Sequence, residues 1–184
     1  MSQKTNTPSI HNYCEVKTDL GRFWIACSPR GITRICPRKE SAGPFESEYK
    51  TRTGMKLQKG PVPEQYKRAL HDALRGKQTS PECIDWDYFT PFQRKVLRQL
   101  LRVRAGTVRS YSWLARESGH PKAARAAGNV MAQNPIPFLL PCHRIVPAAG
   151  GIGNYGYGQA MKRALLEREG VKFPKKSRID GGNA

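Results

Sequence analysis

The apolar positions in the first part of the chain follow a strand pattern broken by turn residues. The run from Leu20 to Cys27 (LGRFWIAC) is rich in aromatic and β-branched side chains, residues 28–31 (SPRG) supply a turn, and a further apolar run begins at Ile32 (ITRIC). Apolar runs separated by Pro and Gly indicate a β-hairpin. Residues 39–62 are polar and rich in turn formers, so we expect a surface loop there.

Helical spacing dominates after this loop. Residues 63–75 (PEQYKRALHDALR) carry apolar side chains three and four positions apart, Gly76 is a stop signal, and residues 77–89 are typical of a linker. A capping box (TPFQ, 90–93) then predicts a helix that ends at Gly106.

Shorter helices follow over 110–119 and 122–132. We therefore expect an α+β protein in which a β-rich N-terminal domain (1–88) precedes a helical C-terminal domain (89–172), with a disordered tail at 173–184.

The charge of the chain indicates an anionic partner. Its 184 residues include 32 Lys and Arg against 14 Asp and Glu, a net charge of +18. Between Thr90 and Val130 Lys and Arg are opposed by Glu117 alone. Such a surface binds polyanions through release of counterions, and we favour nucleic acid over an anionic membrane surface.

No hydrophobic segment suggests a membrane or secretory destination. The longest apolar runs stay far below the roughly 18–20 residues of a transmembrane helix, and the N-terminal MSQKTNTPSIHNY has no apolar stretch. We expect an intracellular protein, in the cytoplasm or the nucleus, without a membrane partner.

Residues 110–132 are a helix-turn-helix candidate. The second helix (KAARAAGNVMA) has small side chains almost throughout and, after Lys122, one long charged side chain, Arg125. A reader of the major groove usually presents several long polar side chains, whereas a helix of small residues can lie close to a narrow groove with one arginine as a probe. The alternative is a closely packed core helix, which explains the alanines but leaves Arg125 without a purpose.

Residues 134–147 (NPIPFLLPCHRIVP) carry the candidate chemistry. Their prolines and apolar run place Cys142 at the end of a stiff, buried segment, directly before His143 and Arg144. The thiolate is the nucleophilic form of cysteine, and a nearby imidazole is a usual means of producing it. We expect an ionised Cys142 at the floor of a cleft. A turn after the cysteine has to bring His143 back to it, because neighbouring residues of a strand point to opposite faces.

The stretch PCHRIVP resembles the active-site signature of the O6-alkylguanine-DNA alkyltransferases, also called methylated-DNA–protein-cysteine methyltransferases. SYSWLA at 110–115, KAARAAGNVMAQNPIP at 122–137 and GIGNYGYG with LLEREG within 151–170 agree in order and spacing, so the resemblance covers about 92–170. It implies an RNase H-like N-terminal domain and a winged-helix-like C-terminal domain.

The implied activity is DNA repair. Cys142 would take an alkyl group irreversibly from O6 of a guanine in double-stranded DNA, once per molecule and as a monomer, after the base is flipped out from the minor groove.

The resemblance also implies roles for the residues around the cysteine. His143 contacts Cys142 through a water and Glu169 orients the histidine, while Tyr111 donates a hydrogen bond to N3 of the leaving guanine. Asn134 tethers the helix pair to the active-site loop.

Further residues would hold the DNA and the flipped base. Arg125 would fill the vacated space in the base stack, and the small residues beside it would lie in the minor groove: Ala124, Ala126, Ala127 and Gly128. Tyr155 would pack against the base, and Ile145 would offer its carbonyl to the guanine amino group. Gly156 stands where many relatives carry a serine, which leaves the hydrogen-bond donor at that point and the width of the pocket open.

No dissociable cofactor is implied. Some members of the family hold zinc in the N-terminal domain, and four cysteines are candidates by residue type alone: Cys14, Cys27, Cys36 and Cys83. Since the five cysteines of the chain form no CxxC pair, we favour unrelated, reduced thiols over a structural zinc site or a disulfide framework.

Two other functions stay open. A non-catalytic reader of alkylated guanine, as in the alkyltransferase-like proteins, would carry another residue in place of Cys142. A cysteine hydrolase using Cys142, His143 and Glu169 would leave the basic helix pair unexplained. The preferred alkyl group and any activity on O4-alkylthymine stay open as well.

Overall fold

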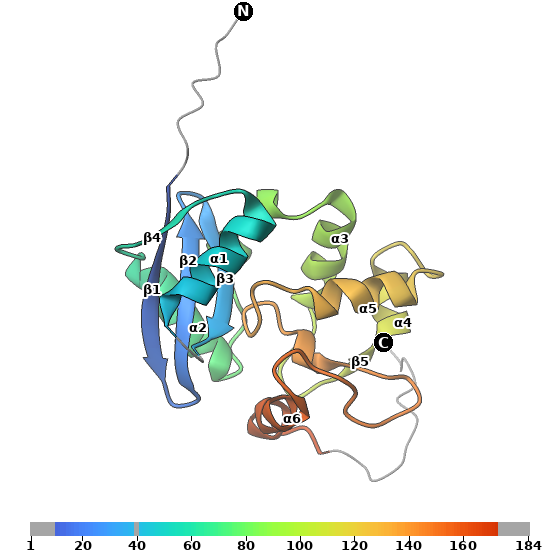
Figure 1. The fold of residues 1–184 in the computed structure, drawn as a ribbon. Coiled ribbons are helices and arrows are strands. Elements are labelled where there is room, and N and C mark those ends of the chain that lie inside the picture. The colour runs from blue at the N-terminus through green and yellow to red at the C-terminus, as the bar shows by residue number, and fades with distance from the viewer. Residues whose placement is uncertain (1–9, 39–40, 173–184) are drawn as a thin grey trace, which may run out of the picture.

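Strands rich in apolar residues build a four-stranded sheet in the first part of the chain (Figure 1). The order is β3 (Gly31–Pro37), β2 (Gly21–Ser28), β1 (His11–Thr18) and β4 (Leu57–Lys59), in which β4 is parallel to β1 and the other pairs are antiparallel. This confirms the predicted hairpin. The computed structural model describes residues 10–38 and 41–172, so the predicted tail at 173–184 lies outside the described residues.

Both faces of the sheet are covered. On one face Tyr13 and Trp24 pack against Phe45 and Tyr49 of α1 (Ala42–Thr53). On the other face, apolar residues that alternate with them, such as Ile25, join a larger cluster that includes Tyr66, Leu70, Ala73 and Leu74 of α2 (Glu64–Leu74). The alternation follows from the two-residue period of a strand.

The prediction of a surface loop over residues 39–62 was wrong. The described part of that segment forms α1 and β4, and α1 ends at Gly54, whose φ of 71° is left-handed. Only Phe45 and Tyr49 of α1 are buried. The helix therefore depends on packing against the sheet, because two apolar residues give too weak a periodic signal to be recognised in the sequence.

The predicted linker at 77–89 is also more ordered than expected. It contains two short 3₁₀ turns, η1 (Pro81–Cys83) and η2 (Trp86–Tyr88), and buries Ile84 and Asp85. The Ser28 hydroxyl donates a hydrogen bond to Asp85. The apolar cluster on this side continues from the sheet into the second part of the chain, and the division into two domains stays a prediction.

The helices of the second part begin where their caps predict. In α3 (Pro91–Leu100) the Thr90 hydroxyl accepts a hydrogen bond from the Gln93 backbone N–H, and the Gln93 side chain accepts one from the Thr90 backbone N–H, which confirms the capping box. The helix ends at Leu100 rather than at Gly106, because the chain turns back there in short i→i+3 hydrogen bonds. α4 (Tyr111–Glu117) and α5 (Ala124–Ala132) form the predicted helix pair.

A small second sheet joins the helix pair to the segment 134–147, which contains Cys142. After α5 the chain passes through η3 (Cys142–Arg144) into β6 (Ile145–Val146), which pairs in parallel with β5 (Arg109–Ser110) just before α4. The last helix within the described residues is α6 (Gln159–Arg168). The segment 134–147 also contacts the first sheet, since the Ile35 backbone N–H of β3 donates to the Pro135 carbonyl at 2.8 Å.

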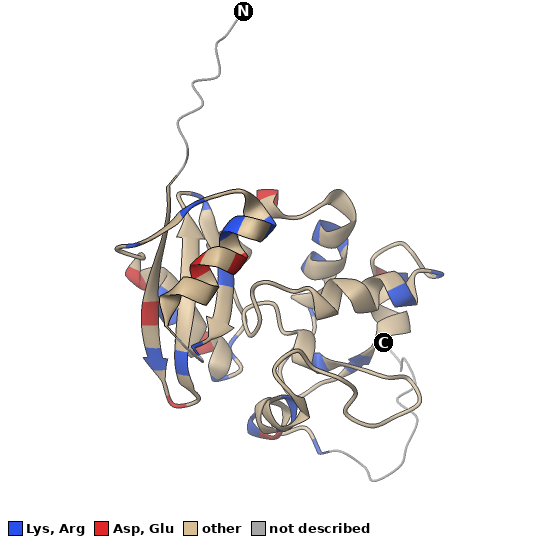
Figure 2. Cartoon of the chain, viewed as in Figure 1, with Lys and Arg blue, Asp and Glu red and all other residues tan. Residues whose placement is uncertain are grey.

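Acidic and basic residues are unevenly distributed over the fold. Figure 2 shows Lys and Arg on α3 and at the helix pair, whereas most Asp and Glu lie on the first sheet, α1 and the segments around them. In the described part of the chain no helix is both long and apolar enough to cross a bilayer.

Candidate active site

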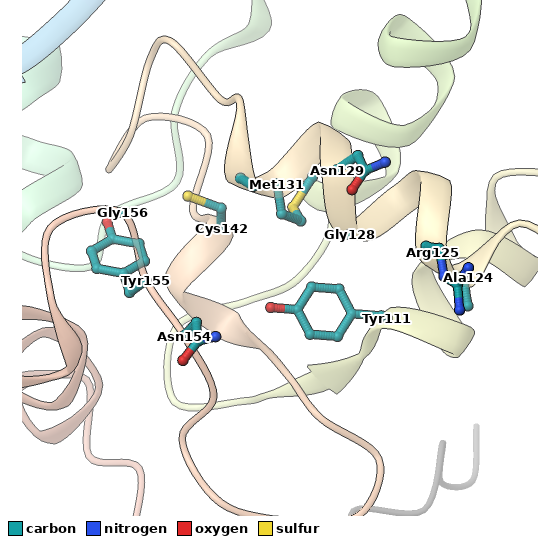
Figure 3. A pocket seen from close by; sticks show the side chains of 11 residues that line it. Tyr111, Ala124, Arg125, Gly128, Asn129, Met131, Cys142, Asn154, Tyr155 and Gly156 are labelled. Atoms are coloured by element: carbon teal, nitrogen blue, oxygen red, sulfur yellow. The ribbon is translucent and has the colours of Figure 1, made fainter.

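A cavity of about 570 Å³ opens between the helix pair and the loop that precedes α6 (Figure 3). Cys142 lies at its inner wall and is 7% exposed. Side chains from α4, α5 and the 154–156 loop complete the lining: Tyr111, Ala124, Arg125, Gly128, Asn129, Met131, Ala132, Asn154, Tyr155 and Gly156. The structure thus brings together residues that are up to 45 positions apart in the chain.

Asn134 holds the cysteine in place. Its side-chain amide donates to the Leu140 carbonyl at 2.9 Å and to Cys142 Sγ at 3.1 Å, while its oxygen accepts from the Ile136 backbone N–H. A single asparagine therefore fixes the loop between α5 and η3 and places a donor on the sulfur.

The sulfur is not held as a thiolate, in contrast to the expectation from the sequence. Burial raises the pKa of the Cys142 thiol, and this outweighs the hydrogen bond from Asn134 and the positive charge of Lys162, which act in the opposite direction. Desolvation penalises the charged form of any acid. The resting protein therefore carries a protonated thiol that needs a base.

His143 is the candidate for the base that deprotonates Cys142. The contacts of its imidazole determine which ring nitrogen carries the proton. The 3₁₀ turn after Cys142 buries His143, whose Nε2 lies 3.0 Å from Glu169 Oε1. Burial lowers the pKa of His143, so the ring is neutral at neutral pH. Because an ionised carboxylate only accepts, Nε2 carries the proton and Nδ1 keeps a free lone pair. This Nδ1 is buried and has no partner among the described residues.

Arg144 balances the charge of the glutamate. Its guanidinium donates to both Glu169 oxygens, at 3.0 and 2.8 Å, and to the Val103 carbonyl at 2.7 Å. Burial by itself would raise the pKa of Glu169, but the hydrogen bonds from His143 and Arg144 outweigh it and lower that pKa to about 2. The carboxylate is therefore charged at neutral pH, and the arginine rather than a charged histidine compensates it.

Lys162 of α6 is fully buried behind the site. Its ammonium group donates to the Ile145 carbonyl at 2.7 Å and lies 3.5 Å from the Asn154 carbonyl. It thereby ties the cavity loop to the segment that carries Cys142. Burial lowers the pKa of Lys162 to about 8, although the nearby Cys142 acts to raise it.

We expect this lysine to make stability depend on pH. Between pH 8 and 10.5 the folded protein releases the proton while the unfolded chain keeps it, so the free energy of unfolding rises with pH in this window. The separation of the two pKa values corresponds to at most about 3 kcal/mol. Urea denaturation of the protein and of Lys162→Met across this window measures the effect, because titration of the cysteines is common to both proteins. Parallel profiles would contradict a titrating Lys162.

Tyr111 and Tyr155 flank the cavity. Figure 3 shows the Tyr111 hydroxyl pointing into the cavity, toward the side where Cys142 and Asn154 lie. Burial raises the pKa of Tyr111, which keeps the hydroxyl a donor. The loop that carries Tyr155 passes close to Pro147 at Gly153, where a Cβ would lie only 2.7 Å from the proline ring and φ is +71°. Only glycine fits this position.

The predicted DNA-contacting residues of α5 separate into two groups. Ala124, Arg125 and Gly128 line the cavity, and Arg125 and Ala126 are exposed. Ala127 is fully buried, so its predicted place on the exposed surface was wrong; it faces the protein interior because α5 must also bury one side.

Ile145 is buried and does not line the cavity. Its carbonyl accepts a hydrogen bond from Lys162, a contact that the sequence did not reveal. Arg144 and Lys162 are two buried charged residues of the site whose roles sequence reasoning missed. In both cases the sequence shows a charged residue at a position where the pattern predicts an apolar one. A charged side chain at such a position is rarely buried without a partner, and this could have indicated a buried ion pair or hydrogen bond.

Comparison with known proteins supports one family. Residues 91–171 match the family model described as 6-O-methylguanine DNA methyltransferase, DNA binding domain. The methylated-DNA–protein-cysteine methyltransferase of Homo sapiens is 51% identical over 85 residues, which are 46% of this chain and 41% of that protein. A probable methylated-DNA–protein-cysteine methyltransferase of Acanthamoeba polyphaga mimivirus is 46% identical over 101 residues, which are 54% of this chain and 67% of that protein.

Solved structures extend the similarity over most of the chain. A crystal structure of Mycobacterium tuberculosis OGT in complex with DNA is 29% identical, with a TM-score of 0.64 over 87% of this chain and 92% of that one. The O6-methylguanine-DNA methyltransferase from Pyrococcus kodakaraensis is 27% identical, with a TM-score of 0.69 over 88% and 99%. The sequence matches to the human protein span about two fifths of its length. This chain belongs to the methylated-DNA–protein-cysteine methyltransferase family.

Proposed function

We propose that this protein repairs DNA by transferring an alkyl group from O6 of guanine to Cys142. The observation that carries the proposal is the position of the Cys142 sulfur on the inner wall of a cavity whose outer rim includes the exposed Arg125 of a basic helix pair. A flipped base could enter such a cavity, whereas a sulfur on the inner wall cannot reach O6 of a base that stays stacked in the duplex.

The proton of the thiol has a defined destination in this proposal. His143 is neutral and has a free lone pair on Nδ1, and a water between Nδ1 and Sγ would pass the proton to it. Glu169 then stabilises the imidazolium that forms. The new thiolate attacks the alkyl carbon, the bond from that carbon to O6 breaks, and its electron pair leaves with the guanine.

Tyr111 would assist the leaving base. The guanine anion gains stability from a hydrogen-bond donor placed beforehand, and the protonated Tyr111 hydroxyl points into the cavity where the base would lie. The proton taken from the thiol finally passes from His143 to the departing guanine anion. Because a thioether does not release its alkyl group, each molecule reacts once.

We propose further that the protein acts as a monomer without a dissociable cofactor. In this view the first sheet belongs to an RNase H-like fold, and the helix pair belongs to a winged-helix-like fold. The described residues include no cluster of three or more His, Cys, Asp or Glu that could hold a metal.

Mass spectrometry of the peptide containing Cys142 tests the proposed function. After incubation with a duplex containing O6-methylguanine, we expect this peptide to gain one methyl group per protein molecule. Tight binding to the modified duplex without this gain would favour the non-catalytic reader. Turnover of a small ester or amide without either result would favour a cysteine hydrolase.

The variant Arg125→Ala tests base flipping separately from alkyl transfer. We expect Arg125→Ala to slow transfer from duplex DNA by 10-fold or more, on the order of the few kcal/mol that unstacking a base costs. Reaction with free O6-benzylguanine should change little, because no base has to be extruded. Rates on both substrates, measured from the alkylated fraction of protein, check this.

Lys122→Ala is the matched control. Lys122 is an exposed cation just before the same helix, and its side chain does not line the cavity. We expect it to weaken DNA binding slightly without separating the two substrates. An equal loss on both substrates in Arg125→Ala would contradict a role in extrusion.

A further inference from the structure

A second cavity, of about 160 Å³, also borders Cys142. It shares Met131, Ala132, Cys142, Tyr155 and Gly156 with the main cavity, so these residues form the boundary between the two. Its remaining lining comes from β3, α1, the 133–137 segment and Tyr157. A group bound to the sulfur therefore has a second space beside the one that a base would occupy.

Two arginines line this second cavity. Arg34 of β3 is 11% exposed at its side chain, and Arg52 of α1 is 51% exposed. Both contact the same carboxylate, since Arg34 Nη2 lies 2.7 Å and Arg52 Nε 3.0 Å from Glu48 Oε1. Two cations share one anion, which leaves a net positive charge at this end of the cavity.

Arg34 also has unused hydrogen-bonding capacity. Its Nε is buried and has no partner among the described residues. A buried donor without a partner is costly and rare in folded proteins, and it points to a group that is absent from the structure. Gln133 adds a polar side chain, and the arginines and Gln133 also line a neighbouring cavity of about 220 Å³. The space is therefore built for a polar, anionic group.

The geometry of the transfer leads a larger substituent toward this space. In a displacement at carbon, the attacking sulfur, the carbon and the leaving oxygen lie close to one line. Any atoms beyond that carbon must project sideways from the line. With guanine in the main cavity, the second cavity offers room beside this line, because it also borders Cys142.

We propose that the second cavity receives the distal end of an O6 substituent, and that Arg34 and Arg52 favour a substituent ending in a carboxylate. The inference rests on the proposed function and names a substrate class for it. The chemistry of transfer is unchanged: Sγ forms a bond to the first carbon of the substituent, the bond from that carbon to O6 breaks, and the electron pair and the thiol proton go to the guanine.

Duplexes with three modified guanines test this proposal: O6-methyl, O6-carboxymethyl and O6-carbamoylmethyl. The last two have similar size and shape but differ in charge. The measurement is the rate of alkylation of Cys142 by each. We expect the carboxymethyl-to-carbamoylmethyl rate ratio to fall about tenfold in Arg34→Gln and in Arg52→Gln, as for the loss of one charge-assisted hydrogen bond. Methyl transfer should be unchanged.

Two further variants separate charge from structure. Arg34→Lys keeps the cation and should retain most of the preference. Arg22→Gln removes an exposed arginine of β2 that pairs with Glu15 and lines neither cavity, and should leave the ratio unchanged.

The outcomes distinguish the two proposals. An unchanged ratio in both glutamine variants overturns the second-cavity proposal. An equal slowing of all three substrates overturns it as well, and assigns the arginines to DNA phosphate binding or to folding. Failure of the unsubstituted protein to react with O6-methylguanine would instead overturn the proposed function.

Discussion

Replacement of Cys142 by alanine is expected to abolish alkyl transfer completely while preserving affinity for duplex DNA. In the proposed function the sulfur is the nucleophile, and alanine has no atom that can form the bond. Cys142 is 7% exposed and lies behind the rim that includes Arg125, so its loss leaves the exposed basic residues of the helix pair in place. Mass spectrometry measures the transfer, and fluorescence anisotropy with labelled duplex measures the affinity.

Cys83→Ala is the control for this variant, because Cys83 is a partly buried thiol of η1 that lines neither cavity. We expect full transfer from it. If Cys142→Ala lost DNA binding, the main role of the cysteine would be structural.

Replacement of Glu169 by alanine should have the largest effect on stability, about 3–5 kcal/mol. The side chain is 5% exposed and neutralises Arg144, which is itself buried. Removing one partner of a buried ion pair leaves an uncompensated charge inside the protein. Transfer should slow as well, because the proton on His143 Nε2 loses the acceptor that fixes it. Urea denaturation at neutral pH measures the change through the transition midpoint.

Lowering the pH should destabilise the protein through protonation of the Glu169 carboxylate. The pKa of Glu169 is about 2 in the folded protein and 4.5 ordinarily, so the unfolded chain takes up the proton first as pH falls. The stabilisation is complete above pH 4.5 and is lost as pH falls toward 2. Glu167→Ala is the control, since this exposed glutamate of α6 should contribute within about 0.5 kcal/mol. Equal stability of the two alanine variants would contradict the ion pair's role.

Interactions between residues close together in the chain explain which structural elements could be predicted from the sequence. The Thr90–Gln93 cap and the hairpin of β2 and β3 are short-range structures. Their partners lie close together in the chain, so the sequence was sufficient to predict both. The helix α1 could not be predicted, because Phe45 and Tyr49 are stabilised by Tyr13 and Trp24 in strands far away in the chain.

For the site, the sequence by itself determined which residues are the candidates for the chemistry, through a cysteine followed by a histidine, a family signature and a basic helix pair. Only the tertiary structure decided their states. Glu169 meets His143 and Arg144 across 25 or 26 positions, and Arg144 reaches the Val103 carbonyl across 41. Protonation depends on burial and on such distant partners, so the neutral His143, the protonated Cys142 and the buried charges of Arg144 and Lys162 emerge only once the chain has folded.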